Sequence, residues 1–162
     1  MTILTKRCTL RPLELEDIPR LSRLFTNRVI RKFLGGATSR EDANEKLKRD
    51  LIDPQKQLHV VCLSHNETII GLISLAPYTQ TGEIEISYQF FTNFWGKGYA
   101  FETLNAVISQ AFEAHEIPYL FAETQSANTR STALLEKLGM THVKSLTKFS
   151  AEQRVYKLVK QQ

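Results

Sequence analysis

Two glycines separated by a single residue, Gly96 and Gly98, carry the clearest chemical signal in this sequence. Glycine allows the backbone to turn sharply and lets a ligand approach without a Cβ in the way. Apolar residues follow at spacings of three and four, which predicts an amphipathic helix that begins beside Gly98. The first turn of a helix has unpaired N–H groups and the positive end of the helix dipole. The pattern therefore predicts a turn that binds a phosphate-bearing ligand.

The spacing of these glycines excludes two common phosphate-binding turns. A P-loop has four residues between its glycines, followed by Lys and Ser or Thr, whereas one residue separates Gly96 from Gly98. A dinucleotide-binding turn needs a third small residue where this chain has Phe101. The ligand class must therefore be read from the residues around the turn.

Several blocks of sequence in and around this turn resemble the GNAT superfamily of N-acetyltransferases. Trp95-Gly96-Lys97-Gly98-Tyr99-Ala100, with Glu102 behind it, is similar to the loop that binds the diphosphate of acetyl-CoA. The segments that resemble the RimJ/RimL-like branch of the superfamily occur in the same order along the chain, and they are Glu85 to Tyr88, Asn128 to Ser131 and Leu134 to Met140.

The resemblance implies a cofactor and a set of residues that bind it. The cofactor is acetyl-CoA, used as a cosubstrate without a metal. The cofactor-binding residues implied are Phe91, Trp95, Gly96, Lys97, Gly98, Tyr99, Ala100, Asn128 and Arg130. Two positions depart from the family pattern, because Asn93 stands where Gln or Arg is usual and Ser87 where many relatives have glycine. The first departure weakens one side-chain contact and leaves the backbone turn intact.

Acetyl transfer from a thioester to an amine needs a group that takes the amine proton and a group that stabilises or protonates the departing thiolate. Glu83 and Glu85 share the polar face of a predicted strand, and Glu85 is the candidate base because its place resembles a family strand position. A carboxylate paired with a cation is an equal alternative for Glu85 and the favoured one for Glu83. By resemblance Ser131 lies near the thioester sulfur and would protonate the thiolate, or it only caps a helix.

The composition fits one globular domain over residues 1–162. The chain is 42% hydrophobic and 23% charged, and its net charge of +4 suits an anionic ligand such as CoA. No apolar run approaches the roughly 20 residues of a membrane span, and the start lacks a signal core, so we expect a cytoplasmic protein that binds no membrane. The basic residues form no aromatic-interleaved stripe, which argues against nucleic acid binding. The four histidines form no cluster, so we expect no metal site.

The hydrophobic periodicity predicts the element order β-α-α-β-β-β-α-β-α-β-β. The predicted strands are 6–11, 58–64, 68–76, 83–90, 119–124, 140–148 and 153–160. Asp17, Ser39 and Asn128 suit helix N-caps, and Gly139 suits the left-handed residue after the last helix. The first helix is expected to bury Leu15, Ile18, Leu21, Leu24 and Phe25.

These elements predict an α/β fold with a mixed, mostly antiparallel sheet of about seven strands and helices on both faces. The GNAT resemblance implies the same order. It also implies a splay between the strand before the glycine turn and the strand after its helix, where the pantetheine arm enters.

The sequence supports two functions of different classes. The leading hypothesis is an acetyl-CoA-dependent N-acetyltransferase that acts directly, in a ternary complex, on a primary amine of a protein N-terminus or a small molecule. The alternative is a non-catalytic module that binds or senses acyl-CoA. Residues 25–40 are expected to shape the acceptor pocket, but their sequence does not identify the acceptor, and both a monomer and a homodimer are open.

Overall fold

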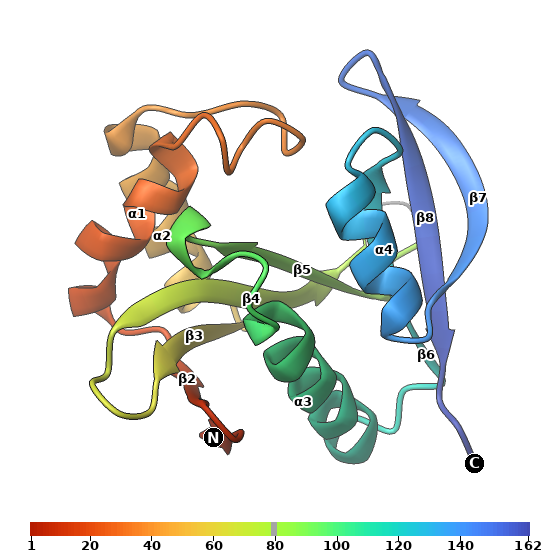
Figure 1. Ribbon diagram of the computed structural model, residues 1–162, viewed down its shortest axis with the longest axis horizontal. Helices are drawn as coiled ribbons and strands as arrows, with labels where there is room; N and C mark the ends of the chain where they lie inside the picture. Colours follow the sequence, from red (N-terminus) through yellow and green to blue (C-terminus); the bar gives the residue numbers. More distant parts are fainter. Residues whose placement is uncertain (79–80) are drawn as a thin grey trace.

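The computed structural model describes residues 1–78 and 81–162 and has a mixed sheet at its centre (Figure 1). In the described residues the sheet has eight strands, which are β1 (Ile3–Leu4), β2 (Cys8–Pro12), β3 (Gln57–Leu63), β4 (Ile69–Pro77), β5 (Ile84–Phe90), β6 (Tyr119–Gln125), β7 (Thr141–Lys148) and β8 (Ala151–Val159). Their order across the sheet is β1-β2-β3-β4-β5-β6-β8-β7. The predicted mixed sheet is confirmed, with one strand more than expected because β1 pairs with the edge of β2.

Neighbouring strands are antiparallel except β5 and β6, which run parallel. In the described part of the chain these two strands are paired at one position, where Glu85 lies beside Phe121. The rest of β5, from Ile86 to Phe90, has no partner in β6. The backbones therefore part toward the glycine turn, as the resemblance implied.

Helices connect the strands at the predicted places. They are α1 (Ile18–Thr26), α2 (Arg40–Ile52), α3 (Tyr99–Ala114) and α4 (Thr129–Lys137), and two 3-10 turns, η1 (Leu15–Asp17) and η2 (Thr92–Phe94), precede α1 and α3. None of the helices in the described residues combines the length and the apolar composition that a membrane crossing needs.

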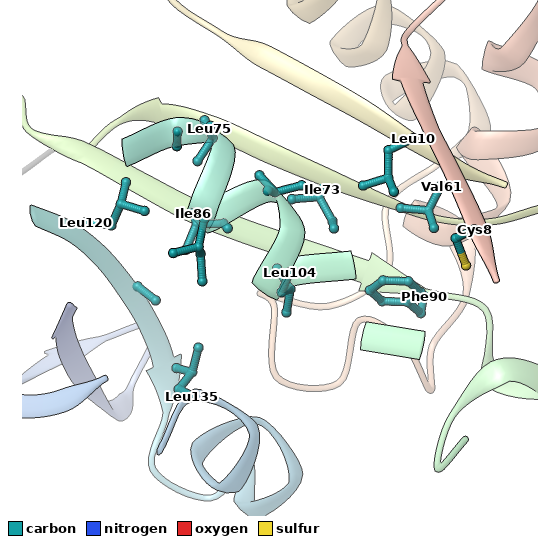
Figure 2. Close-up of a cluster of buried hydrophobic side chains, with 14 of the residues drawn as sticks. Cys8, Leu10, Val61, Ile73, Leu75, Ile86, Phe90, Leu104, Leu120 and Leu135 are labelled. Carbon is teal, nitrogen blue, oxygen red and sulfur yellow. The ribbon is translucent and has the colours of Figure 1, made fainter. Parts of the chain in front are cut away.

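Two hydrophobic clusters cover the two faces of the sheet, so the prediction of helices on both faces is confirmed. Side chains of α1 and α2 pack on Val60 and Leu72, whereas side chains of α3 and α4 pack on Val61, Ile73 and Ile86. Adjacent residues such as Val60 and Val61 belong to different clusters because successive strand residues point to opposite faces. Figure 2 shows the second cluster, in which side chains of the two helices converge on β2 to β6.

Polar and glycine signals set the helix ends as predicted. The Ser39 hydroxyl accepts a hydrogen bond from the N–H of Asp42 at 3.1 Å, and the Asn128 side chain accepts one from the N–H of Ser131 at 3.2 Å. Gly139 has φ +91 just past α4. Each cap supplies a partner for a backbone group that the helix itself leaves unpaired.

The start of α1 differs from the prediction in two ways. Asp17 occupies the N-cap position of α1 but its side chain does not cap this helix. Its carboxylate instead pairs with the Arg11 guanidinium at 2.7 Å and accepts a hydrogen bond from the N–H of Glu14 at 2.9 Å, in the capping box of η1. Leu15 is 58% exposed, since it belongs to η1 and lies outside the buried stripe of the helix. The other four predicted stripe residues are buried.

Candidate active site

The turn predicted to bind phosphate lies between η2 and α3 and is exposed to solvent. Gly96 has φ +72 and Gly98 has φ +83, and both values lie in the left-handed region that favours glycine. Within the described residues, no backbone N–H from Gly96 to Phe101 donates a hydrogen bond. A Cβ at Gly96 would meet no atom within 4 Å. A row of free N–H groups at the positive end of α3 is thus open to an anion.

Hydrogen bonds and an ion pair from Thr5 and Arg7, together called the brace below, hold this turn, and no pattern in the sequence indicates them. Arg7 Nη1 donates to the carbonyl of Lys97 at 2.9 Å, and Arg7 Nε pairs with Glu102 Oε2 at 2.7 Å. Thr5 Oγ1 donates to Glu102 Oε1 at 2.6 Å. The Arg7 guanidinium also lies over the Tyr99 ring, 4.1 Å from its centroid. Glu102, expected only to favour the helix dipole, therefore fixes the first turn of α3 to the segment between β1 and β2.

Glu102→Gln is expected to loosen the turn and weaken CoA binding about fivefold, because the ion pair with Arg7 is lost and the hydrogen bond from Thr5 becomes a neutral one. Burial raises the pKa of Glu102, but the hydrogen bonds from Thr5 and Arg7 outweigh burial and lower the pKa overall. The carboxylate is therefore ionised in the brace at neutral pH. Calorimetric titration with CoA measures the loss, and Glu113→Gln, at the exposed far end of α3, is the matched control. Equal CoA affinity in the two variants would contradict the brace.

The aromatic and basic residues of the motif surround the turn. Trp95 Nε1 donates to the carbonyl of Phe90 at 2.8 Å, which ties the turn to the end of β5. Arg130, in the first turn of α4, places its guanidinium 4.9 Å from the centroid of the Trp95 ring. Tyr99 and Ala100 are half-buried against the α3–α4 cluster. Lys97 and Arg130 are exposed and make no ion pair with a described residue.

Phe91 is placed apart from the other predicted binding residues. Its N–H donates to the carbonyl of Ile70 at 2.9 Å, and its ring belongs to the cluster under α1 and α2. The guanidinium of Arg20 covers this ring at 4.1 Å from the centroid. The N–H of Phe91 is thus already paired within the protein, and a cofactor contact by this half-buried residue stays a prediction.

Two hydroxyl groups meet beside the parting of β5 and β6. The Ser131 and Tyr88 side-chain oxygens lie 2.6 Å apart. Asn128 makes the capping bond of α4, so the Ser131 hydroxyl is engaged with Tyr88 rather than with the helix backbone. Burial raises the pKa of Tyr88 to about 12 although the bond to Ser131 opposes it, so the phenol keeps its proton at neutral pH. The sequence pattern did not single out Tyr88, whose ring packs against the α3–α4 cluster, and the only sign of a further role was the polar end of its side chain.

Glu85 lines a cavity of about 240 Å³ on the α1–α2 side of the sheet, and Tyr88 reaches the same cavity. Burial and the neighbouring charge of Glu123 raise the pKa of Glu85 to about 7, while Lys148 opposes the rise. Among the described residues, Glu85 has no hydrogen bond or ion pair, unlike Glu83, which accepts a hydrogen bond from the Tyr119 hydroxyl. A carboxyl group with a pKa near neutrality can take a proton from an amine.

Three groups thus follow one another along β5 and the turn after it. They are the Glu85 carboxyl group with its raised pKa, the hydroxyl pair of Tyr88 and Ser131, and the free backbone N–H groups of the turn. Residues 7–141 match the family model of the acetyltransferase (GNAT) domain. The chain belongs to the GNAT acetyltransferase family. It is 26% identical over 144 residues to an uncharacterized N-acetyltransferase, p20, of Bacillus licheniformis. The aligned residues cover 85% of this chain and 81% of the relative.

Solved GNAT structures share the fold. An acetyltransferase (GNAT family) from Bacillus anthracis superposes with a TM-score of 0.87 at 21% identity, over 98% of each chain. The spermidine N-acetyltransferase from Vibrio cholerae, in complex with CoA and spermine, gives a TM-score of 0.82 at 19% identity, over 94% of this chain and 95% of that one. RimL and ribosomal-protein acetyltransferases are also among the structures that share the fold. The family model that residues 7–141 match is of the RimJ/RimL type, so the predicted branch is confirmed.

Membership makes this protein an N-acetyltransferase of a family that uses acetyl-CoA. The GNAT fold accounts for the way the predicted residues are assembled. The turn closes β5 on the α3 side, and Ser131 reaches β5 from α4. Glu85 faces the opposite side, and Tyr88, which is hydrogen-bonded to Ser131, also lines the cavity beside Glu85.

Proposed function

We propose that this GNAT protein moves the acetyl group of acetyl-CoA directly to a primary amine while both substrates are bound. The observation that carries the proposal is the arrangement along β5, with Glu85 near its start, Tyr88 beside Ser131 further on, and free N–H groups in the turn beyond its end. Holding the thioester against the amine supplies much of the barrier reduction. In this proposal residues 1–162 act as one acetyltransferase domain, since one sheet runs from β1 to β8.

The cofactor lies on the α3–α4 side in this proposal. The N–H groups from Gly96 to Phe101 bind its diphosphate, because they are unpaired and stand at the positive end of a helix dipole. The exposed cations of Lys97 and Arg130 flank the phosphates. The side-chain amide of Asn128, whose oxygen caps α4, contacts the pantetheine arm where β5 and β6 part. This chemistry requires no metal.

The amine enters from the opposite side and meets Glu85. An amine is protonated at neutral pH and must lose a proton before its lone pair can attack the thioester carbonyl carbon. The Glu85 carboxylate takes that proton, directly or through a water molecule. Its raised pKa suits this role, because a base whose pKa is near the working pH combines a large ionised fraction with proton affinity.

The thiolate leaves on the Ser131 side. When the carbon–sulfur bond breaks, the Ser131 hydroxyl donates its proton to the sulfur and is reprotonated by the Tyr88 hydroxyl, 2.6 Å away. The proton taken up by Glu85 passes to solvent, and the nitrogen loses its second proton to solvent as the tetrahedral intermediate collapses. Tyr88 regains a proton from solvent, so the products are the acetylated amine, CoA thiol and one net proton. Because the Tyr88 phenol is protonated at neutral pH, it can supply this proton throughout the working range.

Ser131→Ala is expected to lower kcat about 10- to 100-fold while CoA affinity stays unchanged, because the proton donor is lost and the backbone cap of α4 is kept. Tyr88→Phe is expected to show a smaller loss of the same kind, since Ser131 can still exchange its proton with water. Thr129→Ala, an exposed hydroxyl in the same helical turn, is the matched control. Full activity in Ser131→Ala would remove this residue from the mechanism.

The function is tested by mixing the protein with acetyl-CoA and a panel of amines and peptides and trapping the released thiol. Thiol release that depends on the amine, with a matching acetylated product, is the expected result. A ping-pong pattern in the kinetics would contradict direct transfer. If calorimetry shows CoA binding but no amine in the panel releases thiol above background, the alternative of an acyl-CoA-binding module replaces the enzyme.

A further inference from the structure

The cavity beside Glu85 contains more charge than the transfer reaction uses. It lies between the α1–α2 side of the sheet and the turn of the β7–β8 hairpin and is lined by side chains from both. Six of the described lining side chains are charged groups, three of each sign, and they are Arg31, Lys46, Asp50, Glu85, Glu123 and Lys148. Their pairing decides which charges are left to bind a substrate.

Four of the six charged side chains lie in ion pairs. Lys46 Nζ lies 2.5 Å from Asp50 Oδ2, and Lys56 Nζ lies 2.6 Å from the other oxygen of that carboxylate. Lys148 Nζ lies 3.5 Å from Glu123 Oε1, and these groups form the second pair. Among the described residues that line the cavity, Arg31 and Glu85 are the charged side chains that form no ion pair.

Arg31 is half-buried and lacks a carboxylate partner among the described residues. Its Nε donates to the carbonyl of Gly36 at 3.1 Å, and its Nη1 donates to Gln89 Oε1 at 3.4 Å. The guanidinium lies 5.3 Å from the centroid of the Phe25 ring. Removing a cation from water without an anion beside it is unfavourable, and a guanidinium has five N–H donors, of which these bonds use two.

We propose that the acceptor carries, on the same molecule as its reacting amine, an anionic group that binds Arg31. The inference rests on the proposed function, because it places the amine at Glu85. Gln89, which touches Arg31, follows Glu85 by four residues on β5, so the two charged ends of the cavity lie up to about 13 Å apart at the rise of a strand. The amine and the anion of a free α-amino acid are too close together to reach both.

The class of acceptor follows from this spacing. An amine and a carboxylate about 7–13 Å apart, as in a peptide amino terminus with an acidic side chain two or three residues on, can reach both charges. The cavity between the two charges has aromatic lining from Phe25, Phe33 and Phe149, which suits an apolar connecting segment. A polyamine lacks the anion and would bring a second cation to Arg31, so the geometry disfavours it.

The test compares acceptors that differ only in the distal charge. Tripeptide amides of sequence Ala-Ala-Glu and Ala-Ala-Gln form one pair, and 6-aminohexanoate and hexylamine form a second pair that separates small molecules from peptides. The anionic member of at least one pair is expected to have a kcat/KM about tenfold higher. Arg31→Met is expected to erase this advantage and leave the neutral acceptor unchanged. Arg28→Met, an exposed arginine three residues earlier, is expected to keep it.

Binding of the same acceptors to the CoA-saturated protein, measured by calorimetry, gives the comparison without turnover. Arg31→Met should weaken binding of the anionic acceptor about tenfold, and Arg31→Lys should restore part of it because the charge returns without the planar fork. Selective binding without thiol release would overturn the proposed function and support this inference. Equal binding of both members of each pair to the wild-type protein, or an equal loss for both in Arg31→Met with a lowered Tm, would overturn the inference and assign Arg31 to folding.

Discussion

Gly98→Asp is expected to weaken CoA binding at least about 100-fold, which is about 2.7 kcal/mol of binding free energy. The new carboxylate would stand among the N–H groups that the diphosphate needs, and two anions cannot share them. The backbone adds a second penalty, because Gly98 has φ +83, a conformation that L residues rarely adopt. A Cβ there would also lie 3.3 Å from Arg7 Nη2, whose guanidinium already bonds Glu102 and the carbonyl of Lys97.

The chain offers a close control for this substitution. Gly82 has φ +78, and a Cβ at this position would meet no atom of the described residues within 4 Å. Gly82→Asp therefore introduces the same charge and the same backbone strain far from the turn. Calorimetry should show near wild-type CoA affinity for Gly82→Asp. Gly98→Ala should fall between the two, because it adds strain without charge. Unchanged affinity in Gly98→Asp would remove the diphosphate from this turn.

The parts of the site that the sequence predicted are those fixed by local backbone geometry. The free N–H groups beside Gly96 and Gly98 result from a glycine turn at the start of a helix. The turn and the helix start are both specified by residues that are adjacent in the sequence. The cap of α4 by Asn128 is local for the same reason, since donor and acceptor are three residues apart. Alternation along β5 likewise placed Glu85 on the face opposite the α3–α4 cluster.

The parts that the sequence did not predict depend on contacts between distant residues. The brace joins Arg7 to Glu102 across 95 residues, and the hydroxyl pair joins Tyr88 to Ser131 across 43. Nothing in either local pattern specifies the partner. Arg31 belongs to this class, because only the packing of its loop against Gln89 shows that its charge lacks an anion. The pairing of β1 with β2 was missed because two residues are too few to show a strand period.

Glu85→Gln is expected to lower kcat about 100- to 1,000-fold with little change in CoA affinity. The amide keeps the size and shape of the side chain but cannot accept a proton from the amine, so the attacking lone pair is no longer generated within the site. Glu83→Gln tests the neighbouring carboxylate and is expected to stay within about twofold of wild type, because Glu83 is already bonded to the Tyr119 hydroxyl. A similar loss in both variants would assign the effect to the strand rather than to a base.

The pH dependence gives this prediction a signature that a structural defect would not produce. In the free enzyme Glu85 has a pKa of about 7, so kcat/KM should rise tenfold per pH unit below pH 7 and level off above it, apart from the titration of the acceptor amine itself. Glu85→Gln should lose the limb at pH 7 and keep that of the amine. An unchanged limb at pH 7 in this variant would show that another group, or water alone, takes the proton.

The raised pKa of Glu85 gives activity and stability opposite dependences on pH. The activity rises with pH, whereas the free energy of unfolding falls. The folded protein holds the Glu85 proton up to about pH 7, whereas the unfolded chain releases it near the ordinary pKa of 4.5. The free energy of unfolding therefore falls as the pH rises from about 4.5 to 7 and stays lower above that range. The side chain in Glu85→Gln is neutral at every pH, so this variant should be more stable than wild type at pH 8, with a smaller difference at pH 5. Thermal unfolding at the two pH values measures the difference. A slower but more stable enzyme at pH 8 is the result that identifies Glu85 as a buried base, because a carboxylate that served only folding would lose stability when it was neutralised.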